Sequence, residues 1–153
     1  MPDTNDATRA LVEAFWAALY ERDWDAIPAF FGPDSIYYDV PVGAFAAAKG
    51  PEDIVKRLRI GLDPLVGYEH GAESTIIVDG ENVATEHLEN WEWPTGEKAS
   101  LPFTSVMKVQ DGVITLWKDY WNYGTLIDNG PSDWLDYLAN QDMSWLFDAT
   151  GIA

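Results

Sequence analysis

Apolar residues recur with a helical period in the first part of the chain. From about Asp6 to Glu21 they return every fourth position, as at Leu11 and Phe15, which predicts an amphipathic helix. A second, shorter helix is predicted from about Trp24 to Phe31, with Gly32-Pro33 ending it.

A strand and a third helix follow. Ser35 to Val40 alternates apolar and polar side chains, which predicts a strand with Tyr37 and Asp39 on one face. Gly50-Pro51-Glu52 is typical of a helix start, because proline fits the first helical turn and acids there face the helix dipole. Arg57 and the neighbouring basic residues are expected on the solvated face of this helix.

The second half of the chain is predicted to be mainly extended. Four segments with strand-like patterns follow one another: roughly Tyr68 to Val78, Asn82 to Trp93, Ala99 to Gln110 and Val113 to Tyr123. Turn-forming residues separate them, Asp79-Gly80 and Asp111-Gly112 among them. Helices first and hairpin-linked strands later predict an α+β domain, with the helices covering one side of an antiparallel sheet.

Ionisable or hydroxylic side chains occupy alternate positions inside otherwise apolar, aromatic sequence. They are Tyr37 and Asp39, His87 and Glu89, and Asp119 flanked by Trp117 and Trp121. A period of two in a strand directs each set toward one face of a sheet. Because a buried carboxylate is costly unless it is paired or hydrogen-bonded, several of them around an aromatic pocket indicate acid–base chemistry on a small apolar molecule.

Composition narrows the possible partners. With 26 acidic and 9 basic residues the formal net charge is −17, which repels phosphate backbones and anionic lipids, so we expect neither a nucleic acid nor a membrane partner. The chain contains no cysteine, which excludes thiol catalysis and disulfides and fits a reducing cytosol. A polar start and the lack of an apolar run of about 20 residues predict a soluble, unprocessed, cytoplasmic protein.

We expect one main domain over residues 1–130 and a separate tail over residues 131–153. The tail combines a capping pattern at Ser132-Asp133 with many aromatic and aliphatic residues, and such an apolar segment is expected to be buried. It is predicted to be helical, and either to close the open end of the pocket as a lid or to pack on a second subunit.

At these residues the chain resembles limonene epoxide hydrolase and the SnoaL-like polyketide cyclases of the nuclear transport factor 2-like superfamily. Four segments carry the resemblance: Tyr37-Tyr38-Asp39-Val40-Pro41, Thr85-Glu86-His87-Leu88-Glu89, Pro94-Thr95-Gly96 and the run from Gly112 to Trp121. The resemblance implies a cone-shaped fold, in which a curved antiparallel or mixed sheet packs against N-terminal helices around a pocket. It also implies a homodimer and chemistry without a cofactor.

The resemblance to epoxide hydrolases assigns a role to each polar residue. Asp119 stands where the family has the base that activates water, and Tyr37 stands where it has a residue that holds this water. Asp39 replaces an asparagine, Glu89 replaces the aspartate that protonates the epoxide oxygen, and His87 replaces an arginine that joins the two carboxylates. An ionised aspartate only accepts hydrogen bonds, and histidine titrates near neutrality, so both of these changes alter the chemistry.

Charge repulsion leads to a similar expectation without the family. Three carboxylates within about 6 Å in a dry pocket cannot all stay ionised, so at least one pKa should rise and leave a neutral acid beside an ionised base. The pocket lining is predicted to consist of Trp16, Trp91, Leu101, Phe103, Trp117 and Trp121. Such a lining would bury a flat, apolar and aromatic or polycyclic molecule.

The sequence is compatible with several functions. The first is epoxide hydrolysis with Asp119 activating water. The second is an isomerase, cyclase, dehydratase or retro-aldol lyase that uses Asp119 and His87 for proton transfer, and the third is a non-catalytic binder or adaptor. We expect no metal site, since no second His–carboxylate pair has ligand spacing, and His70 is expected to be solvated.

Overall fold

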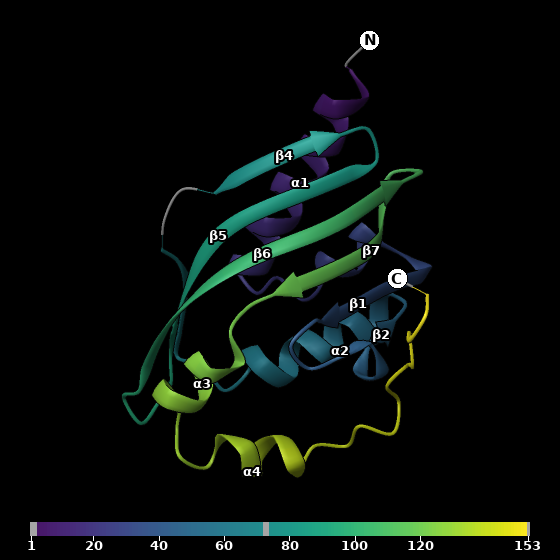
Figure 1. Ribbon diagram of the computed structural model, residues 1–153. Helices are drawn as coiled ribbons and strands as arrows, with labels where there is room; N and C mark the ends of the chain where they lie inside the picture. The colour runs from purple at the N-terminus through teal and green to yellow at the C-terminus, as the bar shows by residue number, and fades with distance from the viewer. Residues whose placement is uncertain (1–2, 72–73, 153) are drawn as a thin grey trace.

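The structure, a computed structural model, describes residues 3–71 and 74–152, which form a strongly curved sheet partly wrapped by helices (Figure 1). The helical elements are α1 (Thr4–Tyr20), η1 (Ile27–Phe30), η2 (Ala44–Ala46), α2 (Pro51–Leu62), α3 (Tyr123–Asn129) and α4 (Trp134–Ala139). The strands are β1 (Phe31–Asp39), β2 (Ala48–Lys49), β3 (Gly67–His70), β4 (Thr75–Asp79), β5 (Asn82–Glu92), β6 (Lys98–Gln110) and β7 (Val113–Tyr120).

Over the described residues the sheet has seven strands in the order β2-β1-β7-β6-β5-β3, and β4 also pairs with β5. All pairs are antiparallel except β1 with β7. The expected α+β class, with a curved mixed sheet and N-terminal helices in a cone-shaped fold, is therefore confirmed. Helices α1 and α2 lie along the concave side, and the C-terminal segment passes around the open end of the sheet (Figure 1).

The period-two pattern places the polar residues on the concave side. Along β5 the side chains from Val83 to Trp91 alternate between buried and more exposed, with His87 and Glu89 among the buried ones. Trp117 lies at the centre of the core, where its ring stacks on Tyr37 with 4.0 Å between centroids. Helix α1 meets this ring edge-on through Phe15, at 4.9 Å.

The predicted helix from Trp24 to Phe31 is wrong. Only a short 3-10 turn forms, at Ile27–Phe30, and the backbone is already extended at Phe31. The strand continues through Gly32-Pro33 because the Ser35 hydroxyl replaces the missing ladder bonds. Its Oγ accepts from the Gly32 N–H at 2.8 Å and donates to the Ile114 carbonyl on β7 at 2.6 Å.

Two strand predictions also need correction. The segment from Tyr68 to Val78 forms two strands, because β3 and β4 pair with different parts of β5: His70 opposite Glu89, and Thr75 opposite Glu86. Residues 72–73, between them, lie outside the described residues. The last strand ends at Tyr120, since the Asn122 side chain accepts from the Gly124 N–H at 2.9 Å and caps α3.

The described part of the tail contacts both sides of the sheet edge. Helix α4 contributes Trp134 and Leu138 to the wall of the cavity described below. Further on, the Phe147 backbone pairs with Ala47, and Ala149 packs against the outer face of β1. The tail therefore buries the face of β1 that points away from the cavity. Whether it also contacts a second subunit stays a prediction.

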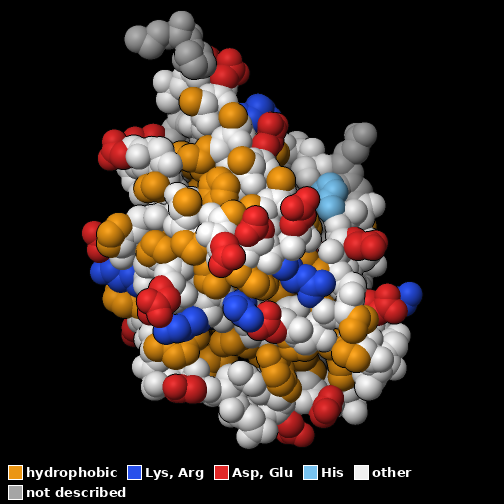
Figure 2. Space-filling model, turned by 180° about the vertical axis from the view of Figure 1, so that it is seen from behind, with side chains coloured by type: hydrophobic (Ala, Val, Ile, Leu, Met, Phe, Trp, Pro, Cys, Tyr) orange, Lys and Arg blue, Asp and Glu red, His pale blue; other side chains and the backbone are white. Residues whose placement is uncertain are grey.

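The few basic side chains are concentrated on the surface. Figure 2 shows Lys and Arg side chains in a band across one face, with acidic groups above and below it. Helix α2 carries Lys56, Arg57 and Arg59, and two of these make exposed ion pairs, for example Arg59 Nε with Asp63 Oδ2 at 2.9 Å. No helix in residues 3–71 and 74–152 is long and apolar enough to cross a membrane.

Candidate active site

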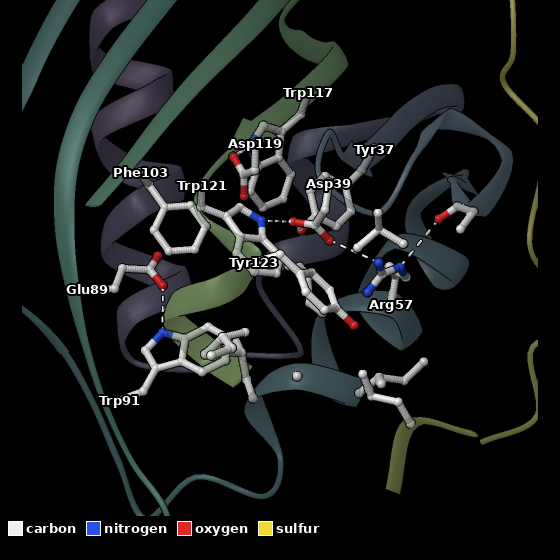
Figure 3. A pocket seen from close by; sticks show the side chains of 18 of the residues that line it. Tyr37, Asp39, Arg57, Glu89, Trp91, Phe103, Trp117, Asp119, Trp121 and Tyr123 are labelled. Atoms are coloured by element: carbon white, nitrogen blue, oxygen red, sulfur yellow. Dashed lines mark hydrogen bonds and ion pairs between the residues drawn. The ribbon is translucent and has the colours of Figure 1, made fainter. Parts of the chain in front are cut away.

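A cavity of about 390 Å³ lies between the concave face of the sheet, helix α2 and the tail. Its walls are mainly aromatic and aliphatic and include Trp91, Phe103, Trp117, Trp121, Leu58, Leu62, Trp134 and Leu138. Three carboxylates also line it, those of Asp39, Glu89 and Asp119 (Figure 3). A largely apolar cavity of this size with a few convergent polar groups is typical of a small-molecule site.

Asp119 on β7 is buried, and one of its oxygens is fixed by two donors. Its Oδ1 accepts from Ser105 Oγ on β6 and from Trp117 Nε1, both at 2.5 Å. Burial, followed by repulsion from the neighbouring Asp39, raises the pKa of the Asp119 carboxyl well above its ordinary value. Asp119 can therefore keep a proton at a pH where an exposed aspartate has lost it.

Asp39 on β1 lies beside Asp119, because the parallel register of β1 and β7 pairs these two positions. Its Oδ1 accepts from the Tyr37 hydroxyl at 3.0 Å and from Trp121 Nε1 at 2.9 Å. Its Oδ2 forms an ion pair with Arg57 Nη2 at 3.0 Å (Figure 3). Burial and the Asp39 charge together raise the pKa of Tyr37 well above its ordinary value. Tyr37 therefore stays protonated and donates a hydrogen bond to this carboxylate.

Glu89 on β5 is held at the other side of the cavity. Its Oε1 accepts from the Tyr68 hydroxyl at 2.9 Å, and its Oε2 accepts from Trp91 Nε1 at 2.9 Å. Burial and the Glu89 charge raise the pKa of Tyr68 well above its ordinary value, so Tyr68 acts here as a donor. The ring of His87 also approaches, with Nε2 at 3.4 Å from Oε1.

The comparison with family models identifies the chain. A model described as the SnoaL-like domain matches residues 12–117. This chain belongs to the SnoaL-like family. The match covers the second half of α1 and most of the strands, including Tyr37, Asp39, His87 and Glu89. It ends at Trp117, two residues before Asp119.

Similar proteins carry several names. Epoxide hydrolase EphG of Mycobacterium tuberculosis is 29% identical over 116 residues, covering 72% of this chain and 70% of that protein. The structure of a limonene-epoxide-hydrolase-like (LEH-like) epoxide hydrolase from M. tuberculosis is 28% identical, covers 90% of this chain and 98% of that one, and superposes with a TM-score of 0.69. A structure titled as a putative polyketide cyclase from Xanthomonas campestris has a TM-score of 0.72 at 23% identity, covering 83% and 98% of the two chains, so it shows the fold alone.

In this SnoaL-like protein the predicted site residues are only partly brought together. Trp91, Phe103, Trp117 and Trp121 line the cavity with the three carboxylates and Tyr37. Trp16 and Leu101, expected in the lining, are buried in the core and do not line it. His70 is exposed, with a ring nitrogen 2.6 Å from Ser74 Oγ.

His87 is buried behind the cavity wall. Its ring stacks on Phe103, with centroids 5.4 Å apart, and lies 4.5 Å from that of Trp16. Among the described residues neither ring nitrogen has a hydrogen bond of good geometry. Its nearest charged neighbour is Glu89, and no contact joins it to Asp119. His87 therefore does not occupy the position between two carboxylates that the resemblance implied.

Sequence reasoning missed Arg57 and assigned it to the solvated face of α2. Its side chain is only 13% exposed and reaches Asp39. Residue 57 is three positions after Ile54, which is fully buried, so the two share a helix face. That spacing, together with an unpaired aspartate expected in the pocket, is the signal that could have identified it.

The raised pKa of Asp119 predicts a pH-dependent stability. A folded-state pKa above the unfolded value stabilises the protein below the unfolded pKa, and this contribution is lost as pH rises through the folded pKa. Asp119→Asn keeps an acceptor for Ser105 and Trp117 but cannot ionise. We therefore expect the melting temperature of this variant, relative to the wild type, to increase between pH 5 and pH 8.

Asp128→Asn is the matched control for this measurement, because Asp128 is exposed on α3. Its melting temperature should stay at a nearly constant difference from the wild type. A constant difference for Asp119→Asn as well would contradict a raised pKa in the folded state.

Proposed function

We propose that this SnoaL-like protein is a cofactor-free acid–base enzyme acting on a small apolar molecule, and that the reaction is the hydrolysis of an epoxide. The observation that carries the proposal is the Asp119 carboxyl, which is buried, lines an apolar cavity and has a raised pKa. A general base or acid works best when its pKa lies near the working pH, and burial moves an aspartate in that direction. The similarity to M. tuberculosis epoxide hydrolases supports the choice of reaction.

The site residues divide the chemistry as follows. Ionised Asp119 takes a proton from water while the water oxygen attacks one epoxide carbon. The bond from this carbon to the epoxide oxygen breaks. That oxygen receives a proton through Glu89, which takes it up from solvent beforehand, and the product is a diol. Asp119 then holds the proton taken from water, and Glu89 has lost its proton to the epoxide oxygen. Proton exchange with solvent restores both groups. Tyr37 donates to Asp39, so its oxygen is free to accept a hydrogen bond from the attacking water.

A second candidate is proton transfer without water attack, as in an isomerase, cyclase, dehydratase or retro-aldol lyase. The position of the charges favours it. Arg57 pairs with Asp39, and His87 approaches Glu89. Within the described residues neither side chain bridges Asp119 and Glu89, whereas the arginine of the epoxide hydrolases is expected to do so. In this reaction Asp119 takes a proton from one substrate atom, and His87 with Glu89, 3.4 Å apart, returns a proton at another atom.

Isotope labelling separates the two reactions. The wild type is incubated with a panel of apolar epoxides, cyclic terpenoid and aromatic, in ¹⁸O-labelled water, and the products are examined by mass spectrometry. We expect a diol with one labelled oxygen, and about 10³-fold slower formation of this diol by Asp119→Asn. If the whole panel gives no diol, hydrolysis is excluded in favour of the second candidate.

A non-catalytic binder or adaptor is the remaining alternative. It predicts that the wild type and Asp119→Asn bind the same ligands and that neither converts them. Such a result, across epoxides and carbonyl compounds, would exclude both enzymatic proposals.

We further propose that the protein is a homodimer, as the resemblance to its superfamily implies, and that it works in the cytoplasm, which the lack of cysteine supports. Light scattering coupled to size-exclusion chromatography tests the oligomer. A mass near twice 17.1 kDa is expected, and a monomer at all concentrations would contradict it.

A further inference from the structure

Arg57 adds a hydrogen-bond donor to the cavity that no step above uses. It comes from α2, whereas the three carboxylates come from the sheet, and it is the only Lys or Arg among the cavity-lining residues of the described chain. Arginine carries five N–H groups in a rigid fork. One points to Asp39 Oδ2 at 3.0 Å and another, from Nε, to the Ala46 carbonyl at 3.5 Å. Three N–H groups therefore remain for a molecule in the cavity.

Arg57 lies near the reacting end of the cavity. Its partner Asp39 is the register neighbour of Asp119 across β1 and β7, and Asp39 also accepts from Trp121. A ligand atom that accepts from Arg57 is therefore placed beside the Asp39 carboxylate, whose other oxygen accepts from Trp121 (Figure 3).

The charge of the surroundings selects the kind of atom that Arg57 can bind. Asp39 already neutralises the guanidinium. Glu89 and Asp119 line the same cavity, and the whole chain has a net charge of −17. An anionic group would therefore meet repulsion in a site of low dielectric, whereas a neutral oxygen accepts the hydrogen bond without it.

We propose that Arg57 is a substrate-binding residue, and that the substrate is an uncharged, mainly apolar molecule with a neutral acceptor oxygen that receives a hydrogen bond from the Arg57 guanidinium. The inference rests on the proposed function, because it assigns a ligand to the same cavity. It adds the polarity of the substrate and the residue that orients it. Arg57 and Asp39 together form a pair without net charge that presents hydrogen-bond donors to the cavity. This pair stands where the resemblance implies one asparagine.

Three naphthalenes of similar shape test the proposal by calorimetry, without turnover: 2-ethylnaphthalene, 2-acetylnaphthalene and 2-naphthoate. They offer no oxygen, a neutral carbonyl oxygen and a carboxylate. A hydrogen bond from a charged donor corresponds to about tenfold in affinity. We expect the wild type to bind the acetyl compound about tenfold tighter than the ethyl compound, and tighter than the naphthoate.

The key variant is Arg57→Met combined with Asp39→Asn, because it removes both charges and leaves no buried carboxylate unpaired. We expect the preference for the acetyl over the ethyl compound to fall to nearly one, while the affinity for the ethyl compound changes less than twofold. Lys56→Met is the matched control, since the Lys56 side chain is more exposed and lies outside the cavity lining. Its preference should equal that of the wild type.

Three results would overturn the proposal: no preference in the wild type, a preference that survives in the double variant, or tightest binding of the naphthoate. Absence of binding by all three probes would also overturn it. A different result would refute the proposed reaction. A preference that depends on Arg57 in a protein that converts no epoxide and no carbonyl compound would refute the enzyme and keep the binding residue.

Discussion

Asp119→Asn is expected to lower turnover by about 10³-fold and to leave the dissociation constant of the ligand within about threefold. An amide keeps an acceptor for Ser105 Oγ and Trp117 Nε1, which hold Oδ1 in the wild type, so the cavity should keep its shape. It cannot take up or release a proton at any relevant pH. The loss should therefore appear in kcat and equally in kcat/KM, as expected for an interaction made in the transition state.

Steady-state kinetics with whichever epoxide the labelling experiment identifies, together with calorimetry on its diol, measures both quantities. Asp128→Asn, on the exposed side of α3, should be indistinguishable from the wild type. Unchanged turnover in Asp119→Asn would refute an enzymatic role for this carboxyl. A parallel loss of turnover and of binding would show that its role is structural.

Arg57→Met is expected to destabilise the protein by about 3 kcal/mol. It leaves the Asp39 carboxylate nearly buried beside Asp119 without its counter-charge, and an uncompensated buried charge costs more than the pair itself contributes. Adding Asp39→Asn should recover most of the loss, because the neutral amide still accepts from Tyr37 and Trp121 and needs no cation. The two substitutions should therefore be strongly non-additive.

Urea unfolding at pH 7 of the wild type, the two single variants and the double variant gives this coupling as a double-mutant cycle. Lys56→Met removes a neighbouring cation from the same helix, whose ion pairs with Glu52 and Asp53 are exposed. It should change the free energy of unfolding by less than about 1 kcal/mol. A double variant whose loss equals the sum of the single losses would contradict a functioning Arg57–Asp39 pair.

Local periodicity predicted much of the fold and of the sheet side of the site. Side chains two apart in a strand point to the same face, so the positions of Glu89 and Asp119 on the concave side follow from the aromatic residues next to them. The same rule places Tyr37 beside Asp39. The resemblance to a known family supplied the curvature of the sheet and the chain segments that meet across it.

Contributions from other elements could not be predicted in the same way. Arg57 reaches Asp39 because α2 crosses the open side of the sheet, and the helical pattern alone describes this residue as one more surface cation. Tyr68 reaches Glu89 only through the antiparallel register of β3 and β5. His87 has the right parity, but its ring stacks on Phe103, and the carboxylate it approaches is Glu89. Partners that depend on the packing of distant elements leave little trace in a local pattern.

The same limit applies to the tail. Its apolar composition predicted burial, and the described part lines the cavity with Trp134 and Leu138. The pairing of Phe147 with Ala47, which covers the outer face of β1, has no counterpart in the local sequence. Both faces of β1 are buried as a result.

The most direct test of the account is a pH titration of the aspartate carboxyl carbons by ¹³C NMR in the wild type and in Asp119→Asn. The resonance that is missing from the variant belongs to Asp119. The account predicts that this resonance titrates well above about 3.9, the ordinary value for aspartate. If it titrates at or below that value, Asp119 is an ordinary ionised carboxylate, and the proposed acid–base role would lose its physical basis.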